Sequence, residues 1–180
     1  MRCVIASDIH GSAFYCRKLI DAYWREKGER LILLGDILYH GPRNELPEGH
    51  DPKGVAEMLN GIAAEILCVR GNCDAEVDQM VLKFPVLADY AIINSKNRLI
   101  YLTHGHHMED HKLPVKPGDA VFFGHTHIPT IREKEGIVYI NPGSVSIPKN
   151  GSQGGYIVLD QNEITFKTLD GREYDRYKLK

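Results

Sequence analysis

The chain has 180 residues and a formal net charge of −2; hydrophobic residues make up 43% of it and charged residues 26%. This balance is typical of a globular protein, and it excludes a disordered chain and a generic nucleic-acid binder, which carries a basic excess. No apolar stretch approaches the roughly 20 residues of a membrane-spanning helix, so we expect one domain over residues 1–180 that does not enter a membrane.

Strand and helix patterns alternate in the first half of the chain. Short apolar runs predict strands at residues 3–6, 31–34 and 66–69. Apolar residues at helical spacing predict helices over residues 12–27 and 52–64. Continuous apolar strands separated by helices are typical of a parallel sheet that is covered on both faces.

The second half is richer in paired strands. A further apolar run lies at residues 121–123. Three pairs of runs flank turn-like segments and predict hairpins: residues 90–93 with 99–102, 130–132 with 137–140, and 156–159 with 163–168. Long irregular segments in a compact domain are often functional, and here they are residues 39–51, 104–119 and 141–155.

The cysteines indicate a reducing compartment. No Cys-x-x-Cys pair occurs, and Cys3 and Cys68 lie within apolar runs, where a cysteine usually acts as a small buried hydrophobe. The apolar run at the start of the chain is too short for a signal peptide. We therefore predict a cytoplasmic protein.

Five of the apolar runs each lead directly to polar side chains that are able to bind metal. In α/β sheets ligands bind beyond the carboxyl ends of the strands, so these side chains are expected to converge. Each residue alone is most simply a turn or capping residue, but their repeated position makes a shared site the better interpretation. In chain order they are Asp8 and His10, Asp36, Asn72, His104, and His125 and His127.

The residue types suit two divalent cations. Four imidazoles, two carboxylates and one amide oxygen give mixed nitrogen and oxygen ligation, which fits Mn, Fe, Zn, Co or Ni better than Ca. Seven ligands are too many for one tetrahedral zinc ion. Two ions about 3.5–4 Å apart need a bridging group, and we predict that the carboxylate of Asp36 is the bridge.

These residues lie in short sequence motifs that resemble a known family signature. Asp8-Ile9-His10, Gly35-Asp36, Gly71-Asn72, His104 and Gly124-His125-Thr126-His127 are similar, in order, to the signature of the calcineurin-like metallophosphoesterase superfamily. Neighbouring words, among them Arg70-Gly71-Asn72-Cys73-Asp74 and Asn141-Pro142-Gly143-Ser144, resemble the small bacterial YfcE-like phosphodiesterases over nearly the whole chain.

The resemblance implies a fold and a ligand set. The fold is an α/β class of two stacked mixed β-sheets flanked by helices, a four-layer α/β/β/α sandwich with the metals at its rim. Manganese is the commonest metal in such bacterial enzymes. One ion is expected on Asp8, His10 and His127, the other on Asn72, His104 and His125, with Asp36 between them.

Three positions depart from the signature. Tyr39 stands where the superfamily has a second Asp, and we interpret it as a loop residue rather than as the metal-binding Tyr of purple acid phosphatases, which lack a counterpart of His10. Cys73 replaces a His that assists the leaving oxygen in many members; a thiol, with an ordinary pKa of about 8.5, is a weaker cationic helper. A space-filling role for Cys73 is equally open. We expect Asp74 to be the N-cap of a helix that begins near Ala75.

Other polar residues are weaker candidates. Arg43 and Asn44 follow Asp36 in one loop, and the forked donors of arginine suit phosphate, so we predict a role in substrate binding for both, and for Cys73. We expect His106 and His107 to support the ligands rather than to bind metal, and Lys149 to be a surface residue.

The resemblance implies hydrolysis of phosphodiester bonds in a small-molecule or nucleotide-type substrate. The expected nucleophile is a hydroxide activated by the two metals, with Asp36, Asn72 and His104 at the catalytic centre. The alternatives are a phosphomonoesterase or a nuclease at the same site, or a scaffold without activity, as in the retromer subunit Vps29, because fold alone does not give function. Cys73 argues against the first and the lack of basic charge against the second; a homo-oligomer is possible.

Overall fold

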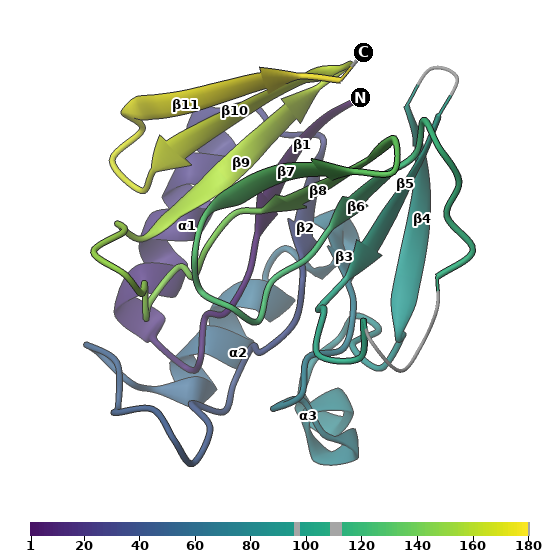
Figure 1. Cartoon of the computed structure of the whole chain (residues 1–180). Coiled ribbons are helices and arrows are strands. Elements are labelled where there is room, and N and C mark those ends of the chain that lie inside the picture. The colour runs from purple at the N-terminus through teal and green to yellow at the C-terminus, as the bar shows by residue number, and fades with distance from the viewer. Residues whose placement is uncertain (96–97, 109–112, 180) are drawn as a thin grey trace.

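Two mixed β-sheets stack face to face in the computed structural model, which describes residues 1–95, 98–108 and 113–179 (Figure 1). This arrangement confirms the predicted fold class. The six-stranded sheet has the order β11-β10-β9-β1-β2-β3, and the five-stranded sheet has the order β4-β5-β6-β8-β7. The strands of the first are β1 (Arg2–Ala6), β2 (Arg30–Leu33), β3 (Ile66–Cys68), β9 (Gly155–Asp160), β10 (Glu163–Thr168) and β11 (Glu173–Lys178). Those of the second are β4 (Tyr90–Ser95), β5 (Arg98–Thr103), β6 (Ala120–Phe122), β7 (Thr130–Lys134) and β8 (Ile137–Asn141).

Strand direction sets where the polar loops lie. Strands β1, β2 and β3 are mutually parallel, as the sequence predicts, and so are β5, β6 and β8 in the other sheet. The three expected hairpins are confirmed as the antiparallel pairs β4–β5, β7–β8 and β9–β10. The carboxyl ends of the parallel strands therefore carry the loops in which the candidate ligands stand.

The inner core forms because side chains alternate across each strand. Cys3 and Ile5 of β1 point toward the other sheet and pack in one cluster with Ile100 and Phe122. Val4 and Ala6 point the opposite way, toward the helices. Each central strand of the six-stranded sheet is thus buried on both faces, which explains why the sequence shows continuous apolar runs there.

Helices cover the outer face of the six-stranded sheet (Figure 1). The covering helices are α1 (Ala13–Arg25), α2 (Pro52–Asn60) and the short 3₁₀ helix η1 (Ala63–Glu65), whereas α3 (Glu76–Val81) lies off the sheet and buries no residue. Ser12 and Asp51 cap α1 and α2 by accepting backbone N–H groups. The helix expected over residues 52–64 ends earlier because Gly61 follows its last turn. None of these helices has the length and apolarity to span a bilayer.

The outer face of the five-stranded sheet has a different cover. Leu113 and Val115 pack there against Tyr101 and Val121, so a loop segment shields this patch. All the cysteines are free thiols; Cys3, Cys16 and Cys68 are buried, as their apolar surroundings predict for the first and last of them. Strand β11 was not expected, because its residues are polar and mostly exposed.

One buried carboxylate fixes the end of α1 to the six-stranded sheet. Glu26 is 7% exposed, and its carboxylate accepts hydrogen bonds from Lys167 Nζ (2.8 and 2.9 Å), the Tyr156 hydroxyl (2.8 Å) and the Arg2 guanidinium (3.1 Å). Burial acts to raise the pKa of Glu26, but these bonds outweigh it and hold the pKa below its ordinary value of 4.5.

We expect Glu26→Gln to lower the free energy of unfolding at pH 7 by about 2 kcal/mol, because it removes charge-assisted hydrogen bonds. The folded-state pKa is depressed, so this contribution is full above pH 4.5 and is lost as the pH falls toward the folded-state value. Urea unfolding at pH 7 and at acidic pH measures the difference. Glu57→Gln is the control, since its ion pair with Lys53 is exposed. An equal effect of Glu26→Gln at both pH values would contradict the argument.

Candidate metal centre

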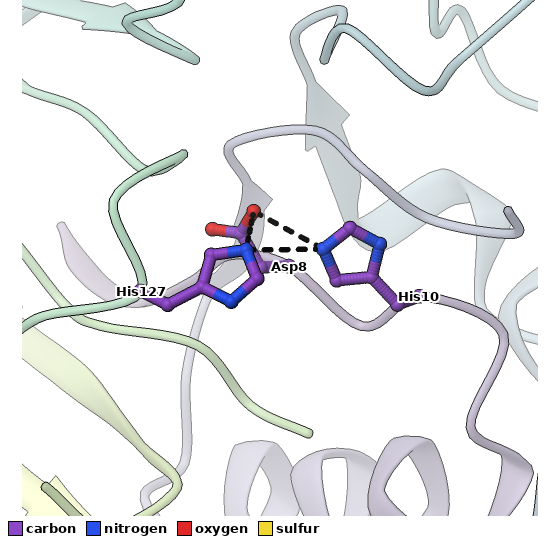
Figure 2. A group of neighbouring side chains, drawn as sticks. All are labelled: Asp8, His10 and His127. Carbon is purple, nitrogen blue, oxygen red and sulfur yellow. Dashed lines mark hydrogen bonds and ion pairs between the residues drawn. The ribbon is translucent and has the colours of Figure 1, made fainter. Parts of the chain in front are cut away.

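Three ligand candidates from distant parts of the chain meet around one point (Figure 2). Nε2 of His127 lies 3.2 Å and Nε2 of His10 lies 3.5 Å from Oδ1 of Asp8. The two Nε2 atoms are 3.2 Å apart. All three side chains are almost fully buried. The loops after β1 and β6, from different sheets, thus share one binding point.

A second group lies next to the first and shares Asp36 with it. Oδ2 of Asp36 is 3.4 Å from Nε2 of His104 and 3.6 Å from Nε2 of His10. The side-chain oxygen of Asn72 is 3.1 Å from the same nitrogen of His104. Asp36 therefore has the position that a bridging carboxylate requires, between a histidine of each group.

Backbone carbonyl groups orient three of the histidine rings. Nδ1 of His10 faces the carbonyl oxygen of Tyr39 at 2.8 Å, Nδ1 of His104 faces that of Leu34 at 2.7 Å, and Nδ1 of His127 faces that of Ile147 at 2.8 Å. A carbonyl oxygen only accepts hydrogen bonds, so each Nδ1 carries the proton. In the neutral rings Nε2 then presents a lone pair, which is the form that binds metal.

The residues fit a bound cation. With both Nδ1 atoms protonated, His10 and His127 point two lone pairs at each other, and the buried Oδ1 of Asp8 accepts no hydrogen bond. Two nitrogens that share one tetrahedral zinc-like ion lie roughly 3.3–3.4 Å apart, because each is about 2.0–2.1 Å from the metal, and the 3.2 Å between these Nε2 atoms is close to that. A proton is the alternative source of charge: burial acts to lower the pKa of His104, yet the carboxylates of Asp36 and Asp8 raise it to about 9. The pocket is built for positive charge.

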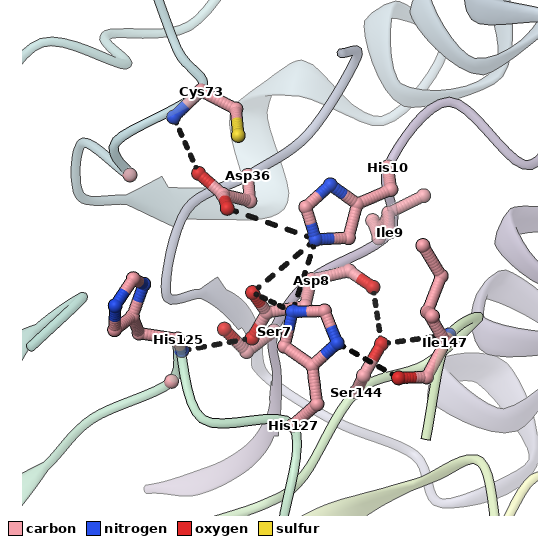
Figure 3. Close-up of polar contacts among 12 residues, drawn as sticks. Ser7, Asp8, Ile9, His10, Asp36, Cys73, His125, His127, Ser144 and Ile147 are labelled. Carbon is pink, nitrogen blue, oxygen red and sulfur yellow. Dashed lines mark hydrogen bonds and ion pairs between the residues drawn. The ribbon is translucent and has the colours of Figure 1, made fainter. Parts of the chain in front are cut away.

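His125 lies at the rim of this arrangement. Its ring packs edge-on against that of His104, with centroids 5.2 Å apart, and its backbone N–H donates to Oδ2 of Asp8 at 3.1 Å (Figure 3). Burial and the neighbouring His104 lower the pKa of His125, so the ring is neutral. Its ring nitrogens belong to none of the tight groups of His, Cys, Asp and Glu among the described residues. Of the predicted ligand histidines, His125 is the least convergent.

The backbone at the site is strained. Non-glycine residues rarely adopt positive φ angles, which cost about 1–3 kcal/mol each and persist where the surroundings enforce them. In the described part of the chain nine such residues occur, and five of them are predicted ligands: Asp8, His10, Asp36, His125 and His127. This concentration is typical of a site that function, rather than stability, has shaped.

A hydrogen-bonded loop supports the first group, and the ligand pattern did not reveal it. The Ser144 hydroxyl donates to the carbonyl oxygen of Asp8 and accepts the N–H of Ile147, the residue whose carbonyl orients His127 (Figure 3). The Ser146 hydroxyl donates to the carbonyl oxygen of Ile9. The sequence shows Ser144 and Ser146 shortly after Asn141, but it does not show their hydrogen-bond partners, which are more than 130 residues away along the chain.

The expectation that Asp74 caps a helix is wrong. Residue Ala75 stands at the N-cap of α3, and Asp74 is buried instead beneath the loops of the ligands. Its carboxylate accepts the N–H groups of Asp36 (2.8 Å), Ile37 (2.8 Å) and Gly71 (2.7 Å). The loop N–H groups take the carboxylate in preference to the end of α3, because each of them would otherwise be buried and unpaired.

A cleft of about 330 Å³ opens beside Asp36. The predicted substrate residues Arg43, Asn44 and Cys73 line it. Lys149, which we expected merely at the surface, is exposed and lines the same cleft. The sequence did not indicate this position, because Lys149 is far along the chain from the loop that carries Arg43. Together, Arg43 and Lys149 bring positive charge to a site of buried carboxylates.

The remaining candidates are close to the centre without entering the ligand groups. His106 packs near the rings of His104 and His125, with centroids 5.3 and 6.2 Å away. His107 stacks on His106 and is exposed. The side chain of Tyr39 is 46% exposed, and only its carbonyl group contacts a predicted ligand. Tyr39 is therefore a loop residue, as predicted.

Comparison with known proteins assigns the family. A model of the calcineurin-like phosphoesterase superfamily domain matches residues 1–163. The chain belongs to this superfamily. Phosphodiesterase YfcE of Escherichia coli strain K12 is 42% identical to this superfamily member over 171 residues, 94% of the chain and 93% of the relative. The predicted resemblance to YfcE-like proteins is thus confirmed.

Solved structures agree with this assignment. The phosphoesterase YfcE from E. coli superposes with a TM-score of 0.94 at 40% identity, and the match covers 100% of each chain. Vps29 from Entamoeba histolytica, solved in complex with zinc, also matches over 100% of each chain, but with a TM-score of 0.66 and 19% identity. The similarity to Vps29 shows a shared phosphoesterase fold alone.

Proposed function

We propose that the chain is a metal-dependent phosphodiesterase with two divalent cations, Mn²⁺ being the favoured metal and Zn, Fe, Co or Ni the alternatives. The observation that carries the proposal is the shared carboxylate: Asp36 lies between His10 and His104, whose Nε2 lone pairs face other acceptors. The relative named Phosphodiesterase YfcE supports the same reaction.

The proposed ligand sets are those that the family resemblance implies, and the two groups support them for every residue except His125, which lies at their rim. Asp8, His10 and His127 would hold one ion, Asn72, His104 and His125 the other, and Asp36 both. When bound, such cations supply Lewis acidity, which makes hydroxide available at neutral pH and neutralises phosphate charge.

The protein's own groups in the cleft bind and position the substrate. Arg43 is suited to the phosphate oxygens by its forked donors, and Lys149 adds a second positive charge. The side-chain amide of Asn44 donates to the carbonyl oxygen of His40, which fixes the loop that presents Arg43. The attacking group is then water-derived hydroxide in line with the departing oxygen, so no side-chain nucleophile is needed.

Cys73 supports a diester rather than a monoester substrate. Burial, together with the charges of Asp36 and Asp74, raises the pKa of the thiol to about 12, so this side chain is neutral. A neutral thiol provides no positive charge to offset the second negative charge of a monoester. It also gives little proton assistance to a poor leaving group. Its backbone N–H donates to Oδ1 of Asp36 at 2.8 Å, so Cys73 also has a structural role.

We expect Cys73→His to raise kcat/KM for a phosphomonoester relative to a diester by about tenfold, because an imidazolium supplies both charge and a proton. Cys73→Ser is the control: it is small and neutral and keeps the backbone contact, so the ratio should stay within about twofold of the wild-type ratio. Wild-type protein that hydrolysed monoesters faster than diesters would overturn the role of Cys73.

A panel assay tests the proposal itself. Metal-stripped protein is reloaded with Mn²⁺, Zn²⁺, Fe²⁺, Co²⁺ or Ni²⁺ and given matched diesters, monoesters and duplex DNA. Diester turnover that depends on added metal is the expected result. Preferred cleavage of monoesters or of DNA would favour a phosphomonoesterase or a nuclease, and metal binding without turnover would favour a scaffold like Vps29. A cytoplasmic location and self-association remain predictions.

A further inference from the structure

A larger hollow of about 530 Å³ lies beside the candidate metal centre. Its volume is within the range of about 300–1,000 Å³ that is usual for small-molecule sites. Among the described residues, its walls combine apolar side chains with one cation and carry no acidic side chain. They include Gly105, Met108, Phe123, Ile128 and Arg132.

The hollow and the metal centre share two loops. Gly105 and His106 directly follow the predicted ligand His104, and Thr126 stands between His125 and His127. The ring of His106, which lines the hollow, is 6.2 Å from that of His125, which lines the cleft of Arg43. A group attached to a phosphate at the metal centre thus reaches the hollow by passing the ring of His125.

Arg132 is held against aromatic rings. Its guanidinium carbon lies 5.0 Å from the ring centroid of Tyr139 and 5.8 Å from that of Phe123. In the described part of the chain the guanidinium of Arg132 makes no hydrogen bond or ion pair, and the side chain is exposed. A guanidinium held in this way presents planar, weakly hydrated surface to the hollow, which favours stacking with a further ring.

We propose that this hollow binds an aromatic ester group of the phosphodiester substrate, with Arg132 as the specificity residue. Aromatic rings stack on guanidinium planes and on apolar walls, and here both lie beside the phosphate position. An aliphatic ester group would gain burial against the apolar walls but no stacking on the guanidinium, so Arg132 is the group that distinguishes the two classes. This inference rests on the proposed diesterase function and adds to it the class of substrate.

Two activated diesters separate the aromatic effect from chemical reactivity. Bis(4-nitrophenyl) phosphate carries only aromatic groups, and bis(2,2,2-trifluoroethyl) phosphate carries none. We expect Arg132→Ala to lower kcat/KM for the first about tenfold, chiefly through KM, and for the second less than twofold. Arg17→Ala, an exposed arginine on α1, is the control and should change neither.

The outcomes distinguish the inference from the function on which it rests. If wild-type protein hydrolyses both diesters and Arg132→Ala affects them equally, or affects neither, the inference is wrong while the function stands. If the metal-loaded wild type hydrolyses neither diester, both are wrong. Calorimetric titration with diphenyl phosphate adds a readout without turnover, and weaker binding to Arg132→Ala than to Arg17→Ala is expected.

Discussion

Asp36→Asn is expected to reduce diester turnover more than about 100-fold, beyond the 10–100-fold loss that removal of a supporting group around a metal causes. Asparagine has the shape of aspartate but lacks the negative charge that two neighbouring cations share. Oδ2 of Asp36 lies between His10 and His104, so both halves of the proposed site would lose a predicted charged ligand at once.

The measurement is kcat for bis(4-nitrophenyl) phosphate with Mn²⁺ added, together with the metal content per chain. Asp119→Asn is a matched control, because Asp119 is also buried and accepts the N–H groups of Leu99 and Lys116, but lies outside the site. We expect the control to be less stable yet active. Full activity of Asp36→Asn with normal metal content would refute a bridging role.

Local sequence pattern was sufficient for most strands and for the ligand candidates. Apolar runs such as residues 31–34 predict buried strands because both faces of β2 are covered, and the residue after such a strand lies at the sheet edge. Strand β11 escaped the pattern because it is an edge strand with little burial, where hydrophobic alternation is not required.

Contacts between distant loops were beyond the reach of the pattern. Gly35 and Gly71 illustrate this: a side chain on Gly35 would collide with the backbone of Gly71, and one on Gly71 would collide with Asp36. Both glycines are visible in the sequence, but the close approach that requires them exists only in the folded chain. The carbonyl groups that orient His10, His104 and His127 are likewise invisible, since any residue supplies one.

Asp74 shows most clearly that contacts between distant loops are not visible in the sequence, and we expect its replacement to have a large effect on stability. Read locally, an Asp before a helix is a cap; in the fold its two oxygens bind the N–H groups of Asp36, Ile37 and Gly71. Asp74→Ala leaves all three donors buried without partners, at a cost of about 1–3 kcal/mol each. We expect the free energy of unfolding to fall by about 3 kcal/mol or more, measured by urea unfolding.

The same carboxylate positions the metal ligands, which separates its role from that of a merely stabilising residue. Asp74→Asn keeps the size of the side chain, and where this variant is fully folded we expect its Mn²⁺ affinity to fall about 10–100-fold. Asp78→Asn is the control, because among the described residues the side chain of Asp78 accepts only the N–H of Ala75, at the start of α3. It should lose about 1 kcal/mol of stability and keep its metal affinity. If both variants bound Mn²⁺ as tightly as the wild type, Asp74 would stabilise the loops without positioning Asp36.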